Sequence, residues 1–578
     1  MGGACSRKRD HLVNEDGLSG RVSGRYMKSG SSKWLGASMS RSSTDANQGN
    51  QSCPSLIDLC IHKIREDVDK YVSFSMLPRD ISQQILDDLI SSQCLTDSVL
   101  EAFRDCALQD LNMGEYPGVN DSWMDIVSSQ GQSLLSVDLS ASDITDLGLA
   151  YLRDCENLQT VNLNYCDQIS DKGLEQLSGL SKLDTLSFRR NCLITARGLG
   201  FLSGLVNLVK LDLERCPNIH GGLYHLKGLS KLDSLNLNCC NCITDTDMKA
   251  LSGLTSLTSL QIASTGVTDL GIAFLKGLRN LTLLNMEGCR VTAACLESLT
   301  ALTALMYLNF SRCRLTDDGC EKLAQLHSLK VLNLGFNEIT SAILVHVKGL
   351  KNLESLNLDS CGINDDGMVH LAGLSNLKSL ELSDTEVGDN GLRHISGLLG
   401  LEILNLSFTS VTDGGLRKLS GLSSLKSLNL DARQITDAGL AALTNLTGLR
   451  HLDLFGARIT DFGTNFLKSF KNLRSLEICG GGLTDAGVKN IKELTSLNLL
   501  NLSQNHHLTD RSLESISGLT RLVSLNISNS RVTSVGLQHL KSLKNLKSLM
   551  LESCKVTASD IRKLQATHLP SLVNFRPE

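Results

Sequence analysis

The chain has 578 residues, of which 41% are hydrophobic, 4% aromatic and 20% charged, and its formal net charge is −5. So few aromatic residues argue against several ordinary globular cores and favour a repeat in which Leu, Ile and Val fill stacked, similar layers. The charge balance gives no case for nucleic-acid binding, which needs a basic stripe, and no run of about 18 apolar residues predicts a membrane span.

Residues 1–52 form a Ser- and Gly-rich tail with scattered Arg and Lys, and we expect this tail to be disordered because it has little apolar area to bury. The first residues match the myristoylation pattern Met-Gly-x-x-x-Ser, which predicts lipidation at Gly2, and Cys5 is available for palmitate beside a basic run. Two lipid chains would hold the protein at a membrane, whereas one myristoyl chain binds only marginally. An ordinary Met-Gly start is the alternative.

The 19 cysteines are an odd number, and no signal peptide precedes them, so we expect reduced thiols in a cytoplasmic protein. Together with the lipid anchor, this predicts a peripheral position on the inner face of the plasma membrane. The cluster of Cys239, Cys240 and Cys242, near Cys216, also invites a zinc interpretation, but it lacks the paired spacing of zinc ligands. We therefore predict no metal and no cofactor.

Residues 53–132 are predicted to form a helical cap. Apolar residues between Leu56 and Tyr71 fall on one helical face, and Pro78 opens a second helix whose apolar positions point inward. The spacing from Leu108 onward follows the later repeats loosely, which predicts a degenerate repeat that closes the stack.

From Leu134 the pattern Leu-x-x-Leu-x-Leu-x-x-Cys/Asn/Thr-x-x-Ile-Thr-Asp-x-Gly-Leu-x-x-Leu recurs every 24 or 25 residues, and eighteen copies fill residues 133–568. The period-two alternation of Leu predicts a strand, and Gly-Leu-x-x-Leu predicts a helix. The Thr before the helix can cap free backbone N–H groups, and the following Asp suits the positive end of the helix dipole. Residues 569–578 are predicted to close the other end.

This pattern resembles the leucine-rich-repeat signature, and the Cys at its ninth position resembles the cysteine-containing subclass found in many F-box proteins. The whole chain also resembles plant proteins of the F-box/leucine-rich-repeat-like kind. The resemblance implies an α/β leucine-rich-repeat solenoid, a curved horseshoe with parallel strands on the concave face and helices on the convex face. A short helical cap precedes it.

Segment 55–64 resembles the elongin-binding box, Ser-Leu-x-x-x-Cys-x-x-x-aliphatic, and segment 77–85 resembles the cullin-contacting box and equally the first half of an F-box, although no F-box Trp follows. Two boxes before leucine-rich repeats look like the Zyg/Zer and F-box kinds of ubiquitin-ligase substrate receptor. The resemblance implies that a Skp- or elongin-type adaptor and a cullin contact Leu56, Cys60, Ile64, Leu77, Pro78, Ile81 and Ile85.

Residues beside the core leucines of each strand are predicted to face the concave surface, where Asn fills one position in ten copies. Departures from that row are more informative, because exposed aromatics and arginines often anchor protein interfaces. We predict that a protein partner contacts Arg189, Arg190, Arg215, Arg312, Phe336, Phe408, Arg433 and Phe455. Random scatter of these residues is the alternative.

The repeats offer neither a nucleophile beside a base nor a phosphate-binding Gly loop, so we predict no enzymatic activity. The leading hypothesis is a non-enzymatic recognition subunit of a cullin-RING, SCF-like ubiquitin ligase, acting in ubiquitin-dependent protein catabolism. The alternative is a lipid-anchored leucine-rich-repeat scaffold or signalling regulator without a ligase, in which residues 53–132 only shield the first repeat.

Overall fold

The computed structural model describes residues 55–431 and 434–576 of the chain. The chain divides into two compact units, residues 1–62 and 63–578, and helix α1 (Leu56–Glu66) crosses the boundary between them.

Several predictions of the sequence analysis lie outside the described residues. They are the disordered tail of residues 1–52, lipidation at Gly2 and Cys5, and the partner-binding role of Arg433. They stay predictions.

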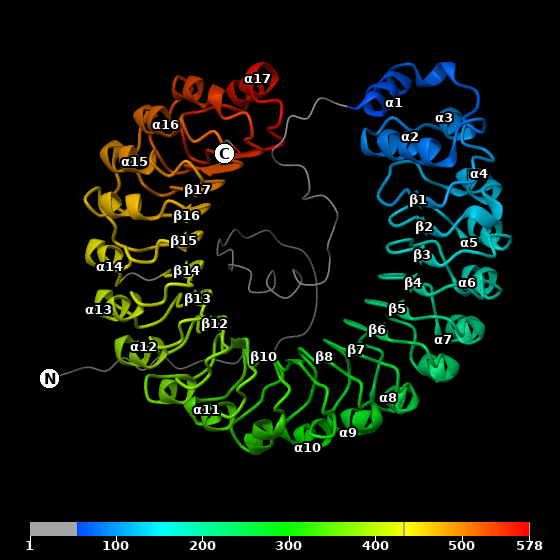
Figure 1. Ribbon diagram of the computed structural model, residues 1–578, viewed down its shortest axis with the longest axis horizontal. Coiled ribbons are helices and arrows are strands. Elements are labelled where there is room, and N and C mark those ends of the chain that lie inside the picture. The colour runs from blue at the N-terminus through cyan, green and yellow to red at the C-terminus, as the bar shows by residue number, and fades with distance from the viewer. Residues whose placement is uncertain (1–54, 432–433, 577–578) are drawn as a thin grey trace, which may run out of the picture. The chain divides into compact units, whose positions relative to one another are not determined.

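Within residues 63–578, the described strands form one parallel sheet of twenty strands, and each strand pairs with the next along the chain (Figure 1). The register places equivalent residues opposite one another, as with Leu332 and Leu356. The strands are β1 (Asp110–Asn112), β2 (Ser136–Asp138), β3 (Thr160–Asn162), β4 (Thr185–Ser187), β5 (Lys210–Asp212), β6 (Ser234–Asn236), β7 (Ser259–Gln261), β8 (Leu283–Asn285), β9 (Tyr307–Asn309), β10 (Val331–Asn333), β11 (Ser355–Asn357), β12 (Ser379–Glu381), β13 (Ile403–Asn405), β14 (Ser427–Asn429), β15 (His451–Asp453), β16 (Ser475–Glu477), β17 (Leu499–Asn501), β18 (Ser524–Asn526), β19 (Ser548–Met550) and β20 (Asn574–Arg576).

Strands β2 to β19 correspond to the eighteen copies counted in the sequence. Strand β1 belongs to the loosely spaced segment before them and pairs with β2, and β20 adds a last strand in the C-terminal segment. The predicted leucine-rich-repeat solenoid with parallel strands is confirmed.

Short helices follow the strands. In residues 63–578 the strands line the inner side of a curve and the helices line its outer side (Figure 1). Among the described helices, none is both long and apolar enough to cross a bilayer. The α-helices are α1, α2 (Arg79–Ser91), α3 (Asp97–Glu101), α4 (Met124–Ser129), α5 (Asp146–Leu149), α6 (Asp171–Leu177), α7 (Ala196–Gly200), α8 (Asp245–Leu251), α9 (Asp269–Ala273), α10 (Leu296–Leu299), α11 (Leu344–Val347), α12 (Asp389–Ile395), α13 (Asp413–Leu416), α14 (Asp437–Ala442), α15 (Asp485–Ile491), α16 (Asp510–Ile516) and α17 (Ala558–His568). The 3₁₀ helices are η2 (Val68–Lys70), η3 (Asp121–Trp123), η4 (Gly131–Ser133), η5 (Ala150–Leu152), η6 (Phe201–Gly204), η7 (Gly222–Gly228), η8 (Phe274–Gly277), η9 (Ala293–Cys295), η10 (Cys320–Gln325), η11 (Ser341–Ile343), η12 (Gly367–Leu371), η13 (Arg417–Leu419), η14 (Gly463–Ser469) and η15 (Gly536–Ser542).

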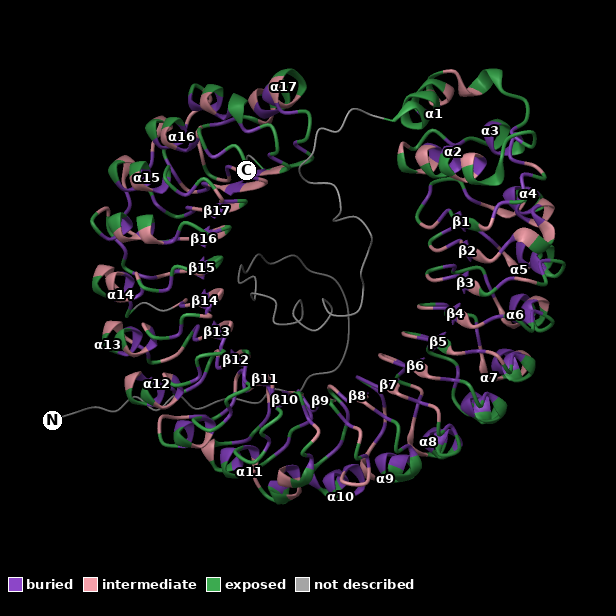
Figure 2. Ribbon diagram, viewed as in Figure 1, coloured by how far each residue is buried: buried purple, intermediate pink, exposed green. Residues whose placement is uncertain are grey.

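The core lies between the strands and the helices (Figure 2). In a typical strand, β11, the middle Leu356 is fully buried, whereas Ser355 and Asn357 on either side of it are only half-buried. The alternation therefore leaves two side chains per strand on the inner face. In the N-terminal cap, Phe74 packs against Phe103 with ring centroids 4.8 Å apart.

In most repeats an aspartate joins one repeat to the next. The Asp413 carboxylate accepts the Thr436 N–H at 2.8 Å and the Thr436 hydroxyl at 2.6 Å, one repeat further along, while Thr436 caps its own helix through the Ala438 N–H. A Cβ atom on Gly439 would overlap the same carboxylate. The Thr-Asp-x-Gly spacing that recurs along the chain thus reflects contacts between repeats as well as the predicted capping of a single helix.

Candidate functional site

The inner strand face carries the half-buried side chains that flank the buried middle residue of the strands, as Ser355 and Asn357 do in β11. Its row of Asn residues serves the fold, because each Asn side-chain oxygen accepts the backbone N–H two residues further on, as Asn285 does for Glu287 at 3.1 Å and Asn357 for Asp359 at 2.8 Å. These bonds hold the chain as it leaves the strand.

The residue three positions after each of strands β1 to β13 and β15 to β19 has a positive φ, between 51° and 72°. This left-handed conformation favours Gly, Asn and Asp tolerate it, and most other residue types adopt it at a cost of about 1–2 kcal/mol. Gly288, Gly456 and Gly480 occupy the position without strain. Large side chains at this position therefore do not serve the backbone.

Five of the eight predicted partner-binding residues occupy this left-handed position. They are Arg190, Arg215, Arg312, Phe336 and Phe408. These side chains were predicted from residue type alone, because the repeat pattern does not reveal the positive φ of their backbone.

Arg189, Arg190 and Arg215 lie together at the ends of β4 and β5. The Arg189 guanidinium lies 3.0 Å from the Asp212 carboxylate and 3.3 Å from that of Glu214, and Arg215 lies 3.8 Å from Glu214. The Arg190 guanidinium stands 5.9 Å from the ring centre of Tyr165. Carboxylates of the same surface thus partly neutralise this group of arginines.

Arg312 and Phe336, in successive repeats, form a second group. The Arg312 guanidinium lies 4.0 Å from the ring centre of Phe336 and 3.5 Å from the Glu287 carboxylate. The ring of Phe336 is therefore half-covered by its neighbour, a cation–π contact that stabilises the surface without a partner.

Phe408 and Phe455 are not covered in this way. The side chain of Phe408 is 62% exposed and that of Phe455 is 37% exposed. The backbone N–H of Phe455 donates to the Asp453 carboxylate at 2.9 Å. At the strand spacing of about 4.8 Å, two repeats separate these rings by about 10 Å.

The sequence analysis missed a strip of carboxylates along the ends of β11 to β16. We call it the acidic strip, and it comprises Asp359, Glu381, Asp384, Asp453 and Glu477. Burial raises the pKa of Glu381 to about 7 and that of Asp453 to about 7, the latter reinforced by Glu477 in register on β16. Burial also raises the pKa of Asp359, which is 6% exposed. The signal available in the sequence was the replacement of Asn by Glu or Asp at three places in the Asn row.

Basic residues line the opposite edge of the same strands. Lys378 lies 2.6 Å from Glu354 and Lys426 lies 2.6 Å from Glu402, while Arg450 and Arg474 are exposed beside His451. Burial, with the charges of Arg474 and Arg450, lowers the pKa of His451. The second half of the inner face thus has one basic edge and one acidic edge.

The predicted adaptor-binding residues differ in exposure. Cys60 and Pro78 are exposed, Leu56 is 76% exposed and Leu77 is 37% exposed, whereas Ile64 and Ile81 are half-buried. Ile85 is 1% exposed.

An adaptor therefore cannot touch Ile85 on the folded surface, and that residue belongs to the core of the cap. Met76, which the sequence analysis did not single out, is 93% exposed directly before Leu77.

The cysteine cluster is structural. The Cys240 thiol donates to the Leu213 carbonyl at 3.0 Å and the Cys216 thiol to the Phe188 carbonyl at 3.2 Å, one repeat earlier in each case. Burial raises the pKa of Cys216 to about 12, which keeps the thiol protonated. Across residues 55–431 and 434–576, no group of His, Cys, Asp and Glu could hold a metal ion.

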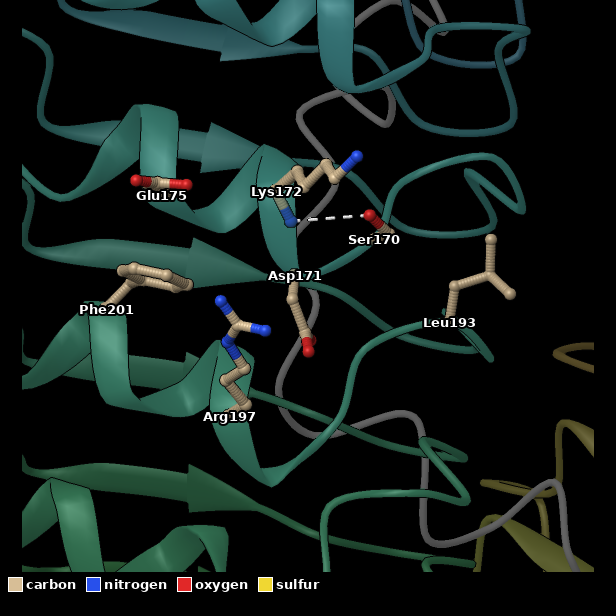
Figure 3. A pocket seen from close by; sticks show the side chains of 7 residues that line it. All are labelled: Ser170, Asp171, Lys172, Glu175, Leu193, Arg197 and Phe201. Atoms are coloured by element: carbon tan, nitrogen blue, oxygen red, sulfur yellow. Dashed lines mark hydrogen bonds between the residues drawn. The ribbon is translucent and has the colours of Figure 1, made fainter.

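A pocket of about 250 Å³ opens on the helical side (Figure 3). It is lined by Ser170, Asp171, Lys172, Glu175, Leu193, Arg197 and Phe201. Its central polar groups are occupied, since Ser170 caps the Lys172 N–H at 3.3 Å and the Asp171 carboxylate accepts the Thr195 N–H at 2.8 Å. These groups join neighbouring repeats.

Three family models match the chain. A leucine-rich repeat region model matches residues 201–443, a leucine rich repeat model matches residues 471–532, and another matches residues 154–178. A search of curated proteins finds no match to the chain.

Several solved structures are similar in fold. An internalin (InlF) from Listeria monocytogenes is 25% identical over 66% of this chain and 89% of its own, with a TM-score of 0.37. A leucine-rich-repeat protein of Leptospira interrogans is 20% identical over 76% and 95%, with a TM-score of 0.39. The ectodomain of the Arabidopsis receptor kinase HAESA, solved with a peptide hormone, is 16% identical over 80% and 81%, with a TM-score of 0.44. These likenesses concern the fold alone.

Proposed function

We propose that this leucine-rich-repeat solenoid is a protein-recognition module whose inner strand face binds another protein. The observation that carries the proposal is the exposure of Phe408, at 62%, on a backbone position that Gly or Ser fills in other repeats. An exposed aromatic side chain on a rigid sheet gains free energy when a partner covers it. Nothing in the fold requires that ring.

The sharper form of the proposal makes the chain a substrate-recognition subunit of a cullin-RING, SCF-like ubiquitin ligase. Exposed apolar side chains in both N-terminal boxes support it: Leu56 is 76% exposed in α1, and Met76 and Leu77 are 93% and 37% exposed before α2. Such side chains are the kind that a Skp- or elongin-type adaptor would cover. The inner face would then present a target for ubiquitin transfer.

The test is co-purification of the full chain, tagged at its C-terminus, from its own cells, followed by mass spectrometry. The double variant Leu56→Ser and Leu77→Ser removes two exposed apolar side chains, so the fold should be kept. Leu147→Ser is the matched control, because Leu147 is also 76% exposed but lies in α5.

We expect an adaptor and a cullin with the wild type and with the control, and neither with the double variant. Absence of every ligase component from the wild type would contradict the ligase proposal. In that case the proteins that remain bound would define a scaffold, and a lipid-anchored signalling regulator would be the function to pursue.

A further inference from the structure

The two halves of the inner face differ in how many of their charged side chains form ion pairs. In the first half, three arginines are paired with carboxylates of the same surface: Arg189 with Asp212 at 3.0 Å, Arg215 with Glu214 at 3.8 Å and Arg312 with Glu287 at 3.5 Å. A partner that binds there must compete with these internal ion pairs. The charges of these arginines are therefore partly neutralised before any partner binds.

The acidic strip has less compensation: the charge of Arg312 acts on Asp359, but burial still raises the pKa of that carboxylate. Within the described part of the chain, none of its five carboxylates forms an ion pair with Arg, Lys or His, and their hydrogen bonds come from neutral groups. Ser360 donates to Asp359 at 2.9 Å and to Asp384 at 3.2 Å, and Asn501 donates to Glu477 at 2.8 Å. Asp453 and Glu477 stand opposite each other in register, an arrangement of like charges that destabilises a sheet.

The exposed phenylalanines lie in the same part of the face. Phe408 follows β13, between the carboxylates of β12 and β15, and Phe455 is bonded through its backbone to Asp453. In the flanking repeats the left-handed position holds Ser360, Asp384 and Gly456, all smaller than Phe. Carboxylates that form no ion pair within the described residues and exposed aromatic rings therefore lie in the same part of the face, between β11 and β16.

We propose that the partner docks on the inner face between β11 and β16 through a segment that carries Arg or Lys beside apolar side chains. The cations would lie against the acidic strip, and the apolar side chains would cover Phe408 and Phe455. Five strand spacings give about 24 Å, the length of about seven extended residues. The basic edge at Arg450 and Arg474 fixes which side of the strands the cations approach. This inference rests on the proposed recognition function and adds the position and chemistry of the site.

The probe is a capped, fluorescein-labelled peptide, Arg-Leu-Arg-Gly-Arg-Leu-Arg, whose binding to the full chain is measured by fluorescence anisotropy at low ionic strength. A peptide with Glu in place of each Arg controls for charge. The test variant combines Glu381→Gln, Asp453→Asn and Glu477→Gln. The matched control variant combines Asp138→Asn, Asp212→Asn and Glu287→Gln, which removes three carboxylates from the first half of the same face.

We expect the basic peptide to bind the wild type, the acidic peptide not to bind, and the test variant to lose about tenfold in affinity while the control variant loses less than about twofold. Equal losses in both variants would overturn the placement, and so would a wild type that does not bind the peptide. Circular dichroism confirms that each variant is folded.

The co-purified proteins separate this inference from the proposed function. A co-purified protein could stay bound to the test variant and be lost when Arg190 and Arg215 are changed to Glu. That result would support the recognition function but refute the placement of the site between β11 and β16. A wild-type chain that binds no protein through its inner face would refute both.

Discussion

Replacing Asp453 with Asn should stabilise the protein at pH 8 and leave its stability unchanged near pH 4. Burial, reinforced by Glu477, raises the pKa of Asp453 to about 7, whereas an exposed Asp titrates at about 3.9. The folded chain therefore holds this proton more tightly than the unfolded chain, and stability is lost as the pH rises from about 4 to about 7. Asn cannot ionise, and its side-chain oxygen can still accept the Phe455 N–H, as Asn429 does for Asp431 at 3.0 Å.

The magnitude follows from the pKa. Each unit corresponds to about 1.4 kcal/mol, so a shift of about three units sets an upper limit of about 4 kcal/mol. The Asp453 side chain is half-buried, and water reaches and screens part of its charge. We expect a gain of about 2 kcal/mol in the free energy of unfolding at pH 8.

The assay is urea unfolding followed by circular dichroism at the two pH values. Asn429→Asp, which adds a carboxylate at the equivalent place on β14, is the reverse control and should destabilise the protein at pH 8 only. A lower urea midpoint for Asp453→Asn at pH 8, or the same change at both pH values, would refute the account of Asp453 as a half-buried carboxylate without an ion pair.

Three further predictions concern the N-terminal lipidation motif, the inner face and the contacts between repeats. Gly2→Ala should move the protein from the membrane fraction to the soluble fraction, and unchanged membrane association would contradict lipidation. Phe408→Ser should weaken binding of the inner-face partner by about tenfold without lowering the melting temperature, whereas a melted protein would show that the ring is structural. Gly439→Ala should lower the free energy of unfolding by about 1–3 kcal/mol, because its Cβ overlaps the Asp413 carboxylate. Adding Asp413→Ala to the same chain should relieve part of that loss. Gly421→Ala is the neutral control, because a Cβ there meets no atom within 4 Å.

The repeat pattern predicts the fold closely because each copy carries its own strand and helix signals. The period of 24 or 25 residues placed the middle Leu or Val of strands β2 to β19 in the core, and the sheet confirms the parallel register. The role of Asp413 was only half predicted, since the pattern shows that Asp follows Thr but not that its carboxylate reaches Thr436 of the next repeat. Contacts between copies appear only when the copies are stacked.

The candidate site was less accessible to sequence reasoning. Residue type alone selected Phe336 and Phe408 together, yet Arg312 covers the first ring and the second is exposed. The raised pKa values in the acidic strip depend on burial, which a single sequence does not report. From the sequence alone, Glu381 and Asp453 are only substitutions in a row of Asn residues.

Asp453→Asn should change the stability of the free chain and its affinity for a partner in opposite directions. In the free protein its carboxylate is costly, because burial and Glu477 oppose its charge. A bound Arg or Lys would favour the charged form, so the same carboxylate would stabilise the complex and release its proton on binding. Asp453→Asn should therefore raise the stability of the free chain while it weakens partner binding at pH 8, and both effects should shrink together as the pH falls below 7. Stability and affinity that change in the same direction would show that Asp453 does not face the partner's cation.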